Sequence, residues 1–312
     1  MQSEGVFRRI LLPVDEWIPS VVSQKLAIFF AKNLGSHVTV LHVIANKIVI
    51  PLSKWPQGAQ EVDPVGISSG GVPRVVEVPQ PRGSILPEEV IDEISGWYIQ
   101  RGSQVIDDAI GLFEKAGLSV EKKLVKQGDP ADIILSEAEK GSYDLIIMGN
   151  GGEEEKDQHL GSVAKKVVMN AQIPVLINRG KTEISKILVP IDGSDNSEKA
   201  LRYAEVLVEK TEAKMTLLYV QESPLSTLKP EISKQMGDAI LEHGASKVAG
   251  TRPELLLESG DPAKKIIDTA RKGSFDLIVM SSRGHGVVMR FLMGSVSDHV
   301  IHYSDRSILL TK

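Results

Sequence analysis

The sequence predicts two tandem α/β domains, each a doubly wound, five-stranded parallel sheet with helices on both faces. The first observation is a repeat: GDPADIILSEAEKGSYDLIIMG, starting at Gly128, returns as GDPAKKIIDTARKGSFDLIVMS, starting at Gly260, at an offset of 260 − 128 = 132. The second is the pair RRILLPVD and SKILVPID, which end at Asp15 and Asp192, at an offset of 192 − 15 = 177. The third is the alternation of β-rich runs with helical periods, which requires right-handed crossovers and therefore a parallel sheet.

The boundary between the two copies falls near residue 180, which gives domains at 1–180 and 181–312. Because the two offsets differ by 177 − 132 = 45, the first copy carries about 45 extra residues between Val43 and Gly128. We place this insert at about 45–87, where frequent prolines and glycines disfavour a packed helix or a central strand. We expect a surface loop there, and the alternative is a lid or an arm that binds a partner.

The elements of the second copy can be predicted in order. ILVPI at 187–191, like ILLPV at 10–14 in the first copy, is a short apolar run typical of a strand buried on both faces. Ser194 or Asp195 can then cap a helix whose apolar residues recur at spacings of three and four. The remaining predicted elements are a strand at 215–220, a helix at about 231–249, a strand near 255–257, a helix after Pro262, the strand DLIVM, a helix that opens at Gly294 and the last strand SILLT.

Composition excludes several classes of function. The net charge is −5 and the basic residues form no block, so nucleic-acid binding is not expected. The absence of cysteine excludes disulfides, thiolate metal sites and cysteine nucleophiles. No apolar run reaches the roughly 18 residues that a membrane span requires, and no signal-type segment precedes the first strand. We therefore expect a soluble, cytoplasmic protein.

The loop after the strand DLIVM carries the residues most suited to binding an anion. Ligands of doubly wound sheets bind at the carboxyl ends of the strands, where the strand order reverses. Gly294 would let a phosphate approach the amides at the start of the next helix, and Ser295 and Ser297 would add hydroxyl donors. Arg283 would supply the cation. This loop and the Asp192 loop on the same sheet edge are the predicted walls of a binding crevice.

These segments resemble the universal stress protein family, in its adenine-nucleotide-binding branch. The family signature is glycine, two residues, glycine, nine residues, glycine and then serine or threonine. Ser281, Gly284, Gly294 and Ser295 match it with one departure, which is serine at the first glycine. The likeness extends to the VPIDGS and GDPA segments and covers both halves except the insert. It implies a Rossmann-like fold similar to the adenine nucleotide alpha-hydrolases, with strand order 3-2-1-4-5, and a non-catalytic, nucleotide-responsive protein of the stress response.

The resemblance also implies a ligand and a site. The ligand is ATP or AMP, with Mg²⁺ as a further candidate. Asp192 would face the adenine or ribose end, the main chain near Ile191 and Val220 would frame the base, and the helix start would hold the outer phosphates. The implied site consists of Pro190, Ile191, Asp192, Gly193, Val220, Met280, Ser281, Arg283, Gly284, Gly294, Ser295, Val296 and Ser297.

The first copy departs further from the signature, and we expect it to be the weaker site. The stretch between its second and third signature glycines has eight residues, Glu153–Leu160, where the signature has nine. This spacer begins with an acidic run that would repel a triphosphate unless the run points into solvent. Ala164 lacks the hydroxyl of Ser297, and Trp17 stands near the expected base pocket. The corresponding residues are Pro13, Val14, Asp15, Val43, Met148, Gly149, Gly152, Gly161, Ser162 and Val163.

The sequence leaves two functions open besides that of a nucleotide-binding protein. A slow ATPase, or an adenylyl- or phosphotransferase that uses Asp192 with a divalent ion, is the alternative to a binding protein. An interaction module without a ligand is the third.

The last strands, IPVLIN and SILLT, are apolar edge strands by their order. In the family that the chain resembles, such strands pair across a dimer, so we expect them to pair here within one chain, as a pseudo-dimer. A homodimer of chains and an unidentified protein partner are further expectations.

Overall fold

The structure is a computed structural model that describes residues 6–45, 88–151, 160–222, 229–248, 250–283 and 293–312. The sequence predictions for the insert, for Gly152 with the acidic run after it, and for Gly284 lie outside the described residues.

Each copy supplies five strands with helices between them. The first copy contains β1 (Arg9–Val14), α1 (Ile18–Leu34), β2 (His37–Ala45), α2 (Glu88–Lys115), β3 (Lys122–Gly128), α3 (Pro130–Lys140), β4 (Leu145–Gly149), α4 (Ser162–Asn170) and β5 (Val175–Asn178). The second copy contains β6 (Lys186–Pro190), α5 (Asp195–Thr211), β7 (Lys214–Gln221), α7 (Pro230–Ser246), β8 (Glu254–Ser259), α8 (Pro262–Lys272), β9 (Leu277–Ser281), α9 (Ser295–Tyr303) and β10 (Ser307–Thr311). The elements expected for the second copy are thus present, with ends shifted by a few residues.

Local chemistry explains where these helices start. Ser194 caps α5 by accepting a hydrogen bond from the Ser197 amide at 3.2 Å, as the sequence predicted. Asp261 caps α8 in the same way, through the Lys264 amide at 2.8 Å, and Pro262 follows it at the first helical position. Proline is favoured there because its missing N–H would have no helical partner.

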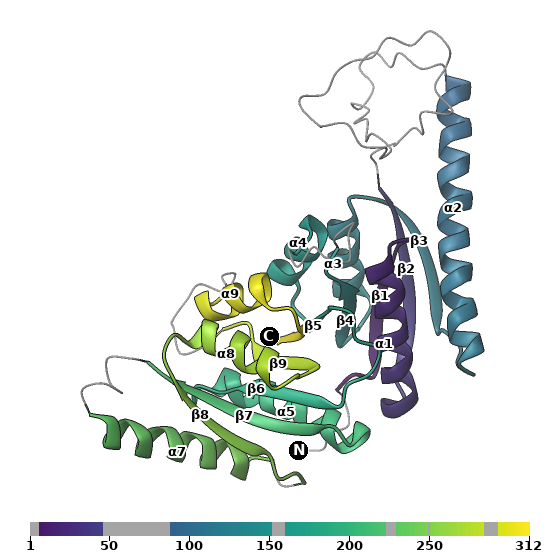
Figure 1. Ribbon diagram of the computed structural model, residues 1–312. Coiled ribbons are helices and arrows are strands. Elements are labelled where there is room, and N and C mark those ends of the chain that lie inside the picture. Colours follow the sequence, from purple (N-terminus) through teal and green to yellow (C-terminus); the bar gives the residue numbers. More distant parts are fainter. Residues whose placement is uncertain (1–5, 46–87, 152–159, 223–228, 249, 284–292) are drawn as a thin grey trace, which may run out of the picture.

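The strands form one ten-stranded sheet in the order β3-β2-β1-β4-β5-β10-β9-β6-β7-β8, so each copy has the predicted order 3-2-1-4-5 (Figure 1). Pairing is parallel within each copy. The copies join through β5 and β10, which run antiparallel, with Ile177 opposite Ile308. The expected contact between the two last strands is therefore present within one chain.

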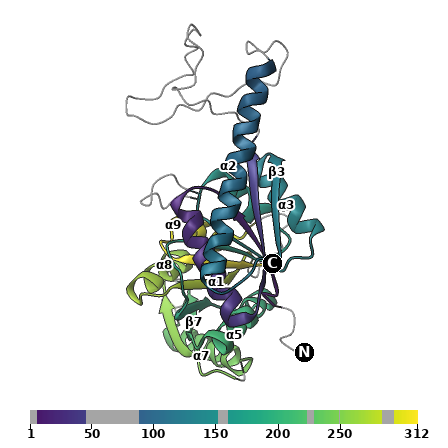
Figure 2. The ribbon, with the colours of Figure 1, turned by 90° about the vertical axis from the view of Figure 1, so that its right-hand side faces the viewer.

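Helices cover both faces of this sheet, as a doubly wound fold requires. Strand residues alternate between the faces: Ile10 and Leu12 pack toward α1, α2, α5 and α7, whereas Leu11 packs toward α3, α4, α8 and α9. Each apolar layer runs without a break through both copies. The helix α2 has 28 residues against 17 in its counterpart α7, and it projects beyond the sheet (Figures 1 and 2).

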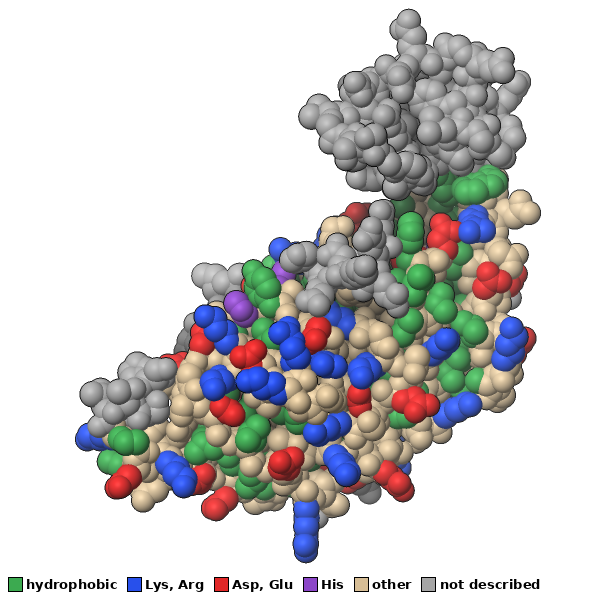
Figure 3. Space-filling model, in the orientation of Figure 1, with side chains coloured by type: hydrophobic (Ala, Val, Ile, Leu, Met, Phe, Trp, Pro, Cys, Tyr) green, Lys and Arg blue, Asp and Glu red, His purple; other side chains and the backbone are tan. Residues whose placement is uncertain are grey.

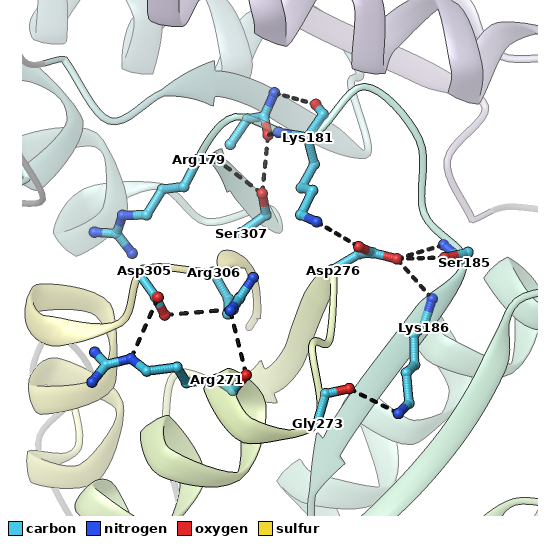
Figure 4. Close-up of polar contacts among 11 residues, drawn as sticks. Arg179, Lys181, Ser185, Lys186, Arg271, Gly273, Asp276, Asp305, Arg306 and Ser307 are labelled. Carbon is cyan, nitrogen blue, oxygen red and sulfur yellow. Dashed lines mark hydrogen bonds and ion pairs between the residues drawn. The ribbon is translucent and has the colours of Figure 1, made fainter. Parts of the chain in front are cut away.

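The linker between the copies is fixed by Asp276, which precedes β9 (Figure 4). Its carboxylate accepts hydrogen bonds from the amides of Ser185 and Lys186, both at 3.0 Å, and from the Ser185 hydroxyl at 2.7 Å. The Lys181 ammonium lies 2.7 Å from the same carboxylate. Burial alone would raise the pKa of Asp276, but the hydrogen bonds from Lys181 and Ser185 outweigh it and hold the pKa below its ordinary value.

The surface carries charges of both signs. On the face that Figure 3 shows, Lys and Arg side chains are interspersed with Asp and Glu, so this face has no extended surface of one sign. None of the described helices combines the length and the apolar character needed to cross a lipid bilayer.

Candidate functional site

A cleft of about 630 Å³ opens at the carboxyl ends of β6, β7 and β9. Its walls also include the first turns of α8 and α9 and part of α7. Of the predicted second-copy residues that the structure describes, all but Gly193 line this cleft: Pro190, Ile191, Asp192, Val220, Met280, Ser281, Arg283, Gly294, Ser295, Val296 and Ser297. The structure thus brings two loops far apart in the sequence to one place.

Gly193 shapes the loop instead of lining the cleft. Its φ is +81°, a left-handed conformation that glycine adopts without strain. This turn lets the Asp192 carboxylate oxygen Oδ1 accept from both the amide and the hydroxyl of Ser194, at 3.0 and 2.6 Å. The turn at Gly193 thus places Asp192, and Gly193 itself is not among the residues that line the cleft.

The start of α9 presents backbone amides to the same cleft. Gly294 is the N-cap residue and has no side chain with which to cap the helix. The first amides of an α-helix have no intrahelical partner, and the helix dipole favours an anion beside them. A Cβ on Gly294 would make ordinary van der Waals contacts with described residues, the nearest at 3.6 Å. This is the arrangement that the sequence predicted for a phosphate.

Two serines of the cleft are engaged in local hydrogen bonds. The Ser297 hydroxyl, which the sequence suggested as a donor to a ligand, donates instead to the Ser281 carbonyl at 3.0 Å. This bond ties the first turn of α9 to the end of β9. The Ser281 hydroxyl accepts from the Arg283 amide at 3.1 Å, so the serine that replaces the first signature glycine stabilises the loop.

The first copy has a smaller cleft, of about 290 Å³, in the equivalent place. Its lining includes every predicted first-copy residue that the structure describes: Pro13, Val14, Asp15, Val43, Met148, Gly149, Gly161, Ser162 and Val163. Trp17 and Pro19 line it as well, which agrees with the tryptophan expected near this pocket. Burial raises the pKa of Asp15, although a hydrogen bond from the Trp17 amide, at 3.0 Å, opposes this shift.

Comparison with known proteins identifies the family. A model of the universal stress protein family matches residues 79–179 and, separately, residues 183–312, which together are well over half of the chain. The chain belongs to the universal stress protein family.

Individual family members match one copy or both. The universal stress protein YxiE of Bacillus subtilis is 32% identical over 147 residues, which cover 41% of this chain and 99% of YxiE. A universal stress protein of Mycolicibacterium smegmatis is 24% identical, over 97% of this chain and 96% of its own length. The crystal structure of a universal stress protein from Archaeoglobus fulgidus has a TM-score of 0.64 and 25% identity, over 98% of this chain and 97% of that one. The tandem arrangement thus occurs in other members.

Sequence reasoning missed part of the lining of this universal stress protein's larger cleft. Pro262 and Ile266 could have been found from the repeat, because their counterparts Pro130 and Ile134 line the smaller cleft. Ser197 and Leu218 likewise have counterparts there, Ser20 and Leu41, whereas the other missed residues lie on β7, directly after it and on α7 and have no such counterpart. The lining residues that were missed are Ser197, Leu218, Tyr219, Gln221, Glu222, Ser233, Met236, Pro262 and Ile266.

The two copies differ at the first signature glycine for a steric reason. A Cβ on Gly149 would lie 2.9 to 3.0 Å from atoms of Pro19, two of which belong to the backbone. The second copy has Asn196 at the position of Pro19, since 196 − 19 = 177, and it carries Ser281 at the position of Gly149. Pro19 therefore requires glycine in the first copy only.

We expect Gly149→Ser to lower the free energy of unfolding by about 1–3 kcal/mol, because the backbone of α1 must shift. The reverse change, Ser281→Gly, should cost no more than about 1 kcal/mol, since it adds chain entropy and removes one acceptor. Urea unfolding of both variants measures the difference. Equal losses would contradict the role assigned to Pro19.

Metal-ligating side chains do not gather in the described part of the chain. No group of three or more His, Asp or Glu suited to a metal ion is found there.

Proposed function

We propose that the larger cleft binds an adenine nucleotide, ATP or AMP, and that this protein acts through binding and not through catalysis. The observation that carries the proposal is the uncapped start of α9, which faces the same cleft as the apolar ends of β6, β7 and β9. The helix start suits an anion, and the apolar strand ends suit a flat ring. A cleft of about 630 Å³ falls in the range of roughly 300–1,000 Å³ that is usual for such ligands.

The chemistry along the cleft matches the parts of a nucleotide. Ile191, Val220 and Met280 provide apolar surface for a base. Asp192 also lines the cleft, where a carboxylate can accept hydrogen bonds from ribose hydroxyls. Arg283 and the amides of α9 offer donors to phosphate oxygens. Membership of the universal stress protein family supports the same proposal.

The smaller cleft is the weaker candidate in this proposal. Its volume of about 290 Å³ lies just below the usual range for such ligands. Trp17 and Pro19 line the smaller cleft, whereas Ser194 and Asn196, which stand at these positions in the second copy, are not in the lining of the larger cleft. We infer that ATP prefers the larger cleft.

Calorimetric titration of the protein, freed of any copurified small molecule, tests the proposal. We expect ATP and AMP to bind with one strong site per chain, adenosine to bind more weakly, and GTP to bind least. No heat with saturating adenylates would refute it. Incubation with ATP and Mg²⁺ distinguishes a binding protein from an enzyme. Retention of ATP without turnover supports a binding protein, whereas steady release of ADP or AMP would make the protein an enzyme.

A further inference from the structure

Two cations stand at equivalent places on either side of the junction between the copies. Arg179 directly follows β5, and Lys312 directly follows β10. Their offset, 312 − 179 = 133, equals that of the helix-opening glycines, 294 − 161 = 133. They are therefore counterparts in the repeat, although one is an arginine and the other a lysine.

Each cation makes a hydrogen bond to a helix of the other copy. The Arg179 guanidinium donates to the Ile301 carbonyl of α9 at 2.6 Å, and the Lys312 ammonium donates to the Val168 carbonyl of α4 at 2.7 Å. The two carbonyls are counterparts as well, since 301 − 168 = 133. Figure 4 shows the Arg179 side chain extending away from Lys181, toward the ribbon that carries Asp305. We call these two reciprocal bonds the cross-copy clamp.

The two cations of the clamp bind near the carboxyl ends of α9 and α4, where a positive charge stabilises a helix most. The last four carbonyls of a helix have no intrahelical partner, and Ile301 and Val168 are among them, because α9 ends at Tyr303 and α4 at Asn170. A positive charge is also favoured at this end of the helix dipole. Both cations are largely buried: burial lowers the pKa of Arg179 to about 10, and burial together with the charge of Arg283 lowers the pKa of Lys312 to about 8.

The other ends of the same helices face the clefts. Gly294 and Ser295 open α9 at the larger cleft, and Gly161 and Ser162 open α4 at the smaller one. Each helix has nine residues, and a hydrogen-bonded helix of this length spans roughly 13 Å as one stiff element. A shift at the carboxyl end of α9 therefore moves the amides at its start.

We propose that Arg179, which belongs to the first copy, is a positioning residue for the anion-binding end of the larger cleft, and that Lys312 has the same role for the smaller cleft. Each cleft is thus completed by the other copy. The assignment of phosphate to this end rests on the function proposed above, whereas the clamp itself does not.

Hydrogen exchange of the ligand-free protein tests the clamp without any nucleotide. Arg179→Met removes a charge-assisted bond, so we expect exchange in the second half of α9 to become on the order of tenfold faster, with α4 unchanged. Lys312→Met should reverse this pattern. Arg179→Lys should restore slow exchange, since a lysine makes the equivalent bond at 312.

Arg271→Met is the matched control, because Arg271 pairs at 3.4 Å with Asp305, whose charge also acts on Arg179, yet this ion pair does not involve Ile301. It should leave the second half of α9 close to wild type. Equal acceleration in both helices, or none in either, would overturn the clamp.

Nucleotide titration then tests the positioning role. Arg179→Met should weaken ATP binding about five- to tenfold and leave adenosine binding unchanged, and Arg179→Lys should recover ATP binding. A parallel loss for ATP and adenosine would overturn the positioning role. If the wild type binds no adenylate, the proposed function fails, and the exchange pattern alone decides the clamp.

Discussion

Ser295→Asp is expected to lower the affinity for ATP on the order of 100-fold while leaving the protein folded. Ser295 is exposed and opens α9 at the larger cleft. An aspartate there meets the positive end of the helix dipole and should stabilise the helix by about 0.3–1 kcal/mol. The same carboxylate occupies the place of a phosphate and repels it, by about 4 kcal/mol at 4 Å near a protein surface before screening by salt. Calorimetry for affinity and thermal unfolding for stability separate the two effects.

Two variants serve as controls for this change. Ser295→Asn has the shape of the aspartate without its charge, so it should lose less than about tenfold in ATP affinity. Ser162→Asp places the same carboxylate at the start of α4, at the smaller cleft, and should scarcely change ATP binding. Equal losses from Ser162→Asp and Ser295→Asp would contradict the preference for the larger cleft, and an equal loss from Ser295→Asn would show that charge is not the cause.

The repeat made the fold and the centre of the cleft predictable. Because Asp15 and Asp192 follow equivalent strands, the repeat predicted two tandem domains, whereas the strand order 3-2-1-4-5 was implied by the resemblance to the universal stress protein family. The pairing of β5 with β10 was expected from the same resemblance and from the apolar character of both strands, and Ile177 does lie opposite Ile308. The loops at the carboxyl ends of the first and fourth strands of a copy must meet at one edge of such a sheet, which is why both were expected in one cleft.

The remaining features depend on geometry that no spacing encodes. The direction of the Ser297 hydroxyl is decided by the Ser281 carbonyl 3.0 Å away, which belongs to another element. Ser233 and Met236 line the cleft only because of how α7 lies on the sheet. The clamp was also missed. The offset between the copies changes from 132 to 133 after the signature loop, because the first copy has one residue fewer there. Only the offset of 133 aligns Arg179 with Lys312.

Asp276→Ala is expected to lower the free energy of unfolding by about 3 kcal/mol at pH 7. Asp276 is 8% exposed, and its removal leaves the Ser185 and Lys186 amides and the Lys181 ammonium without their acceptor. Breaking a buried ion pair from one side typically costs about 3–5 kcal/mol, and Lys181 is partly exposed, so the lower end applies. Urea unfolding measures the loss.

Asp144→Ala is the matched variant in the first copy. Asp144 accepts from the amides of Arg8 and Arg9, at 2.9 and 3.1 Å, at the equivalent strand start. Burial is the largest influence on its pKa and raises it, although these amides and the Arg9 charge oppose the shift. We expect its replacement to cost less at pH 7 than Asp276→Ala, because the ionised carboxylate of Asp144 is disfavoured by the fold.

The two aspartates should also respond to pH in opposite directions. The lowered pKa of Asp276 means that its contribution is fully present above the unfolded value of about 3.9 and is lost as the pH falls through the folded pKa. The raised pKa of Asp144 means that its contribution is fully present below about 3.9 and is lost as the pH rises through the folded pKa. The cost of Asp276→Ala should therefore shrink on acidification below about pH 4, while the cost of Asp144→Ala grows. Parallel pH profiles for the two variants would show that the linker contacts of Asp276 do not distinguish the copies.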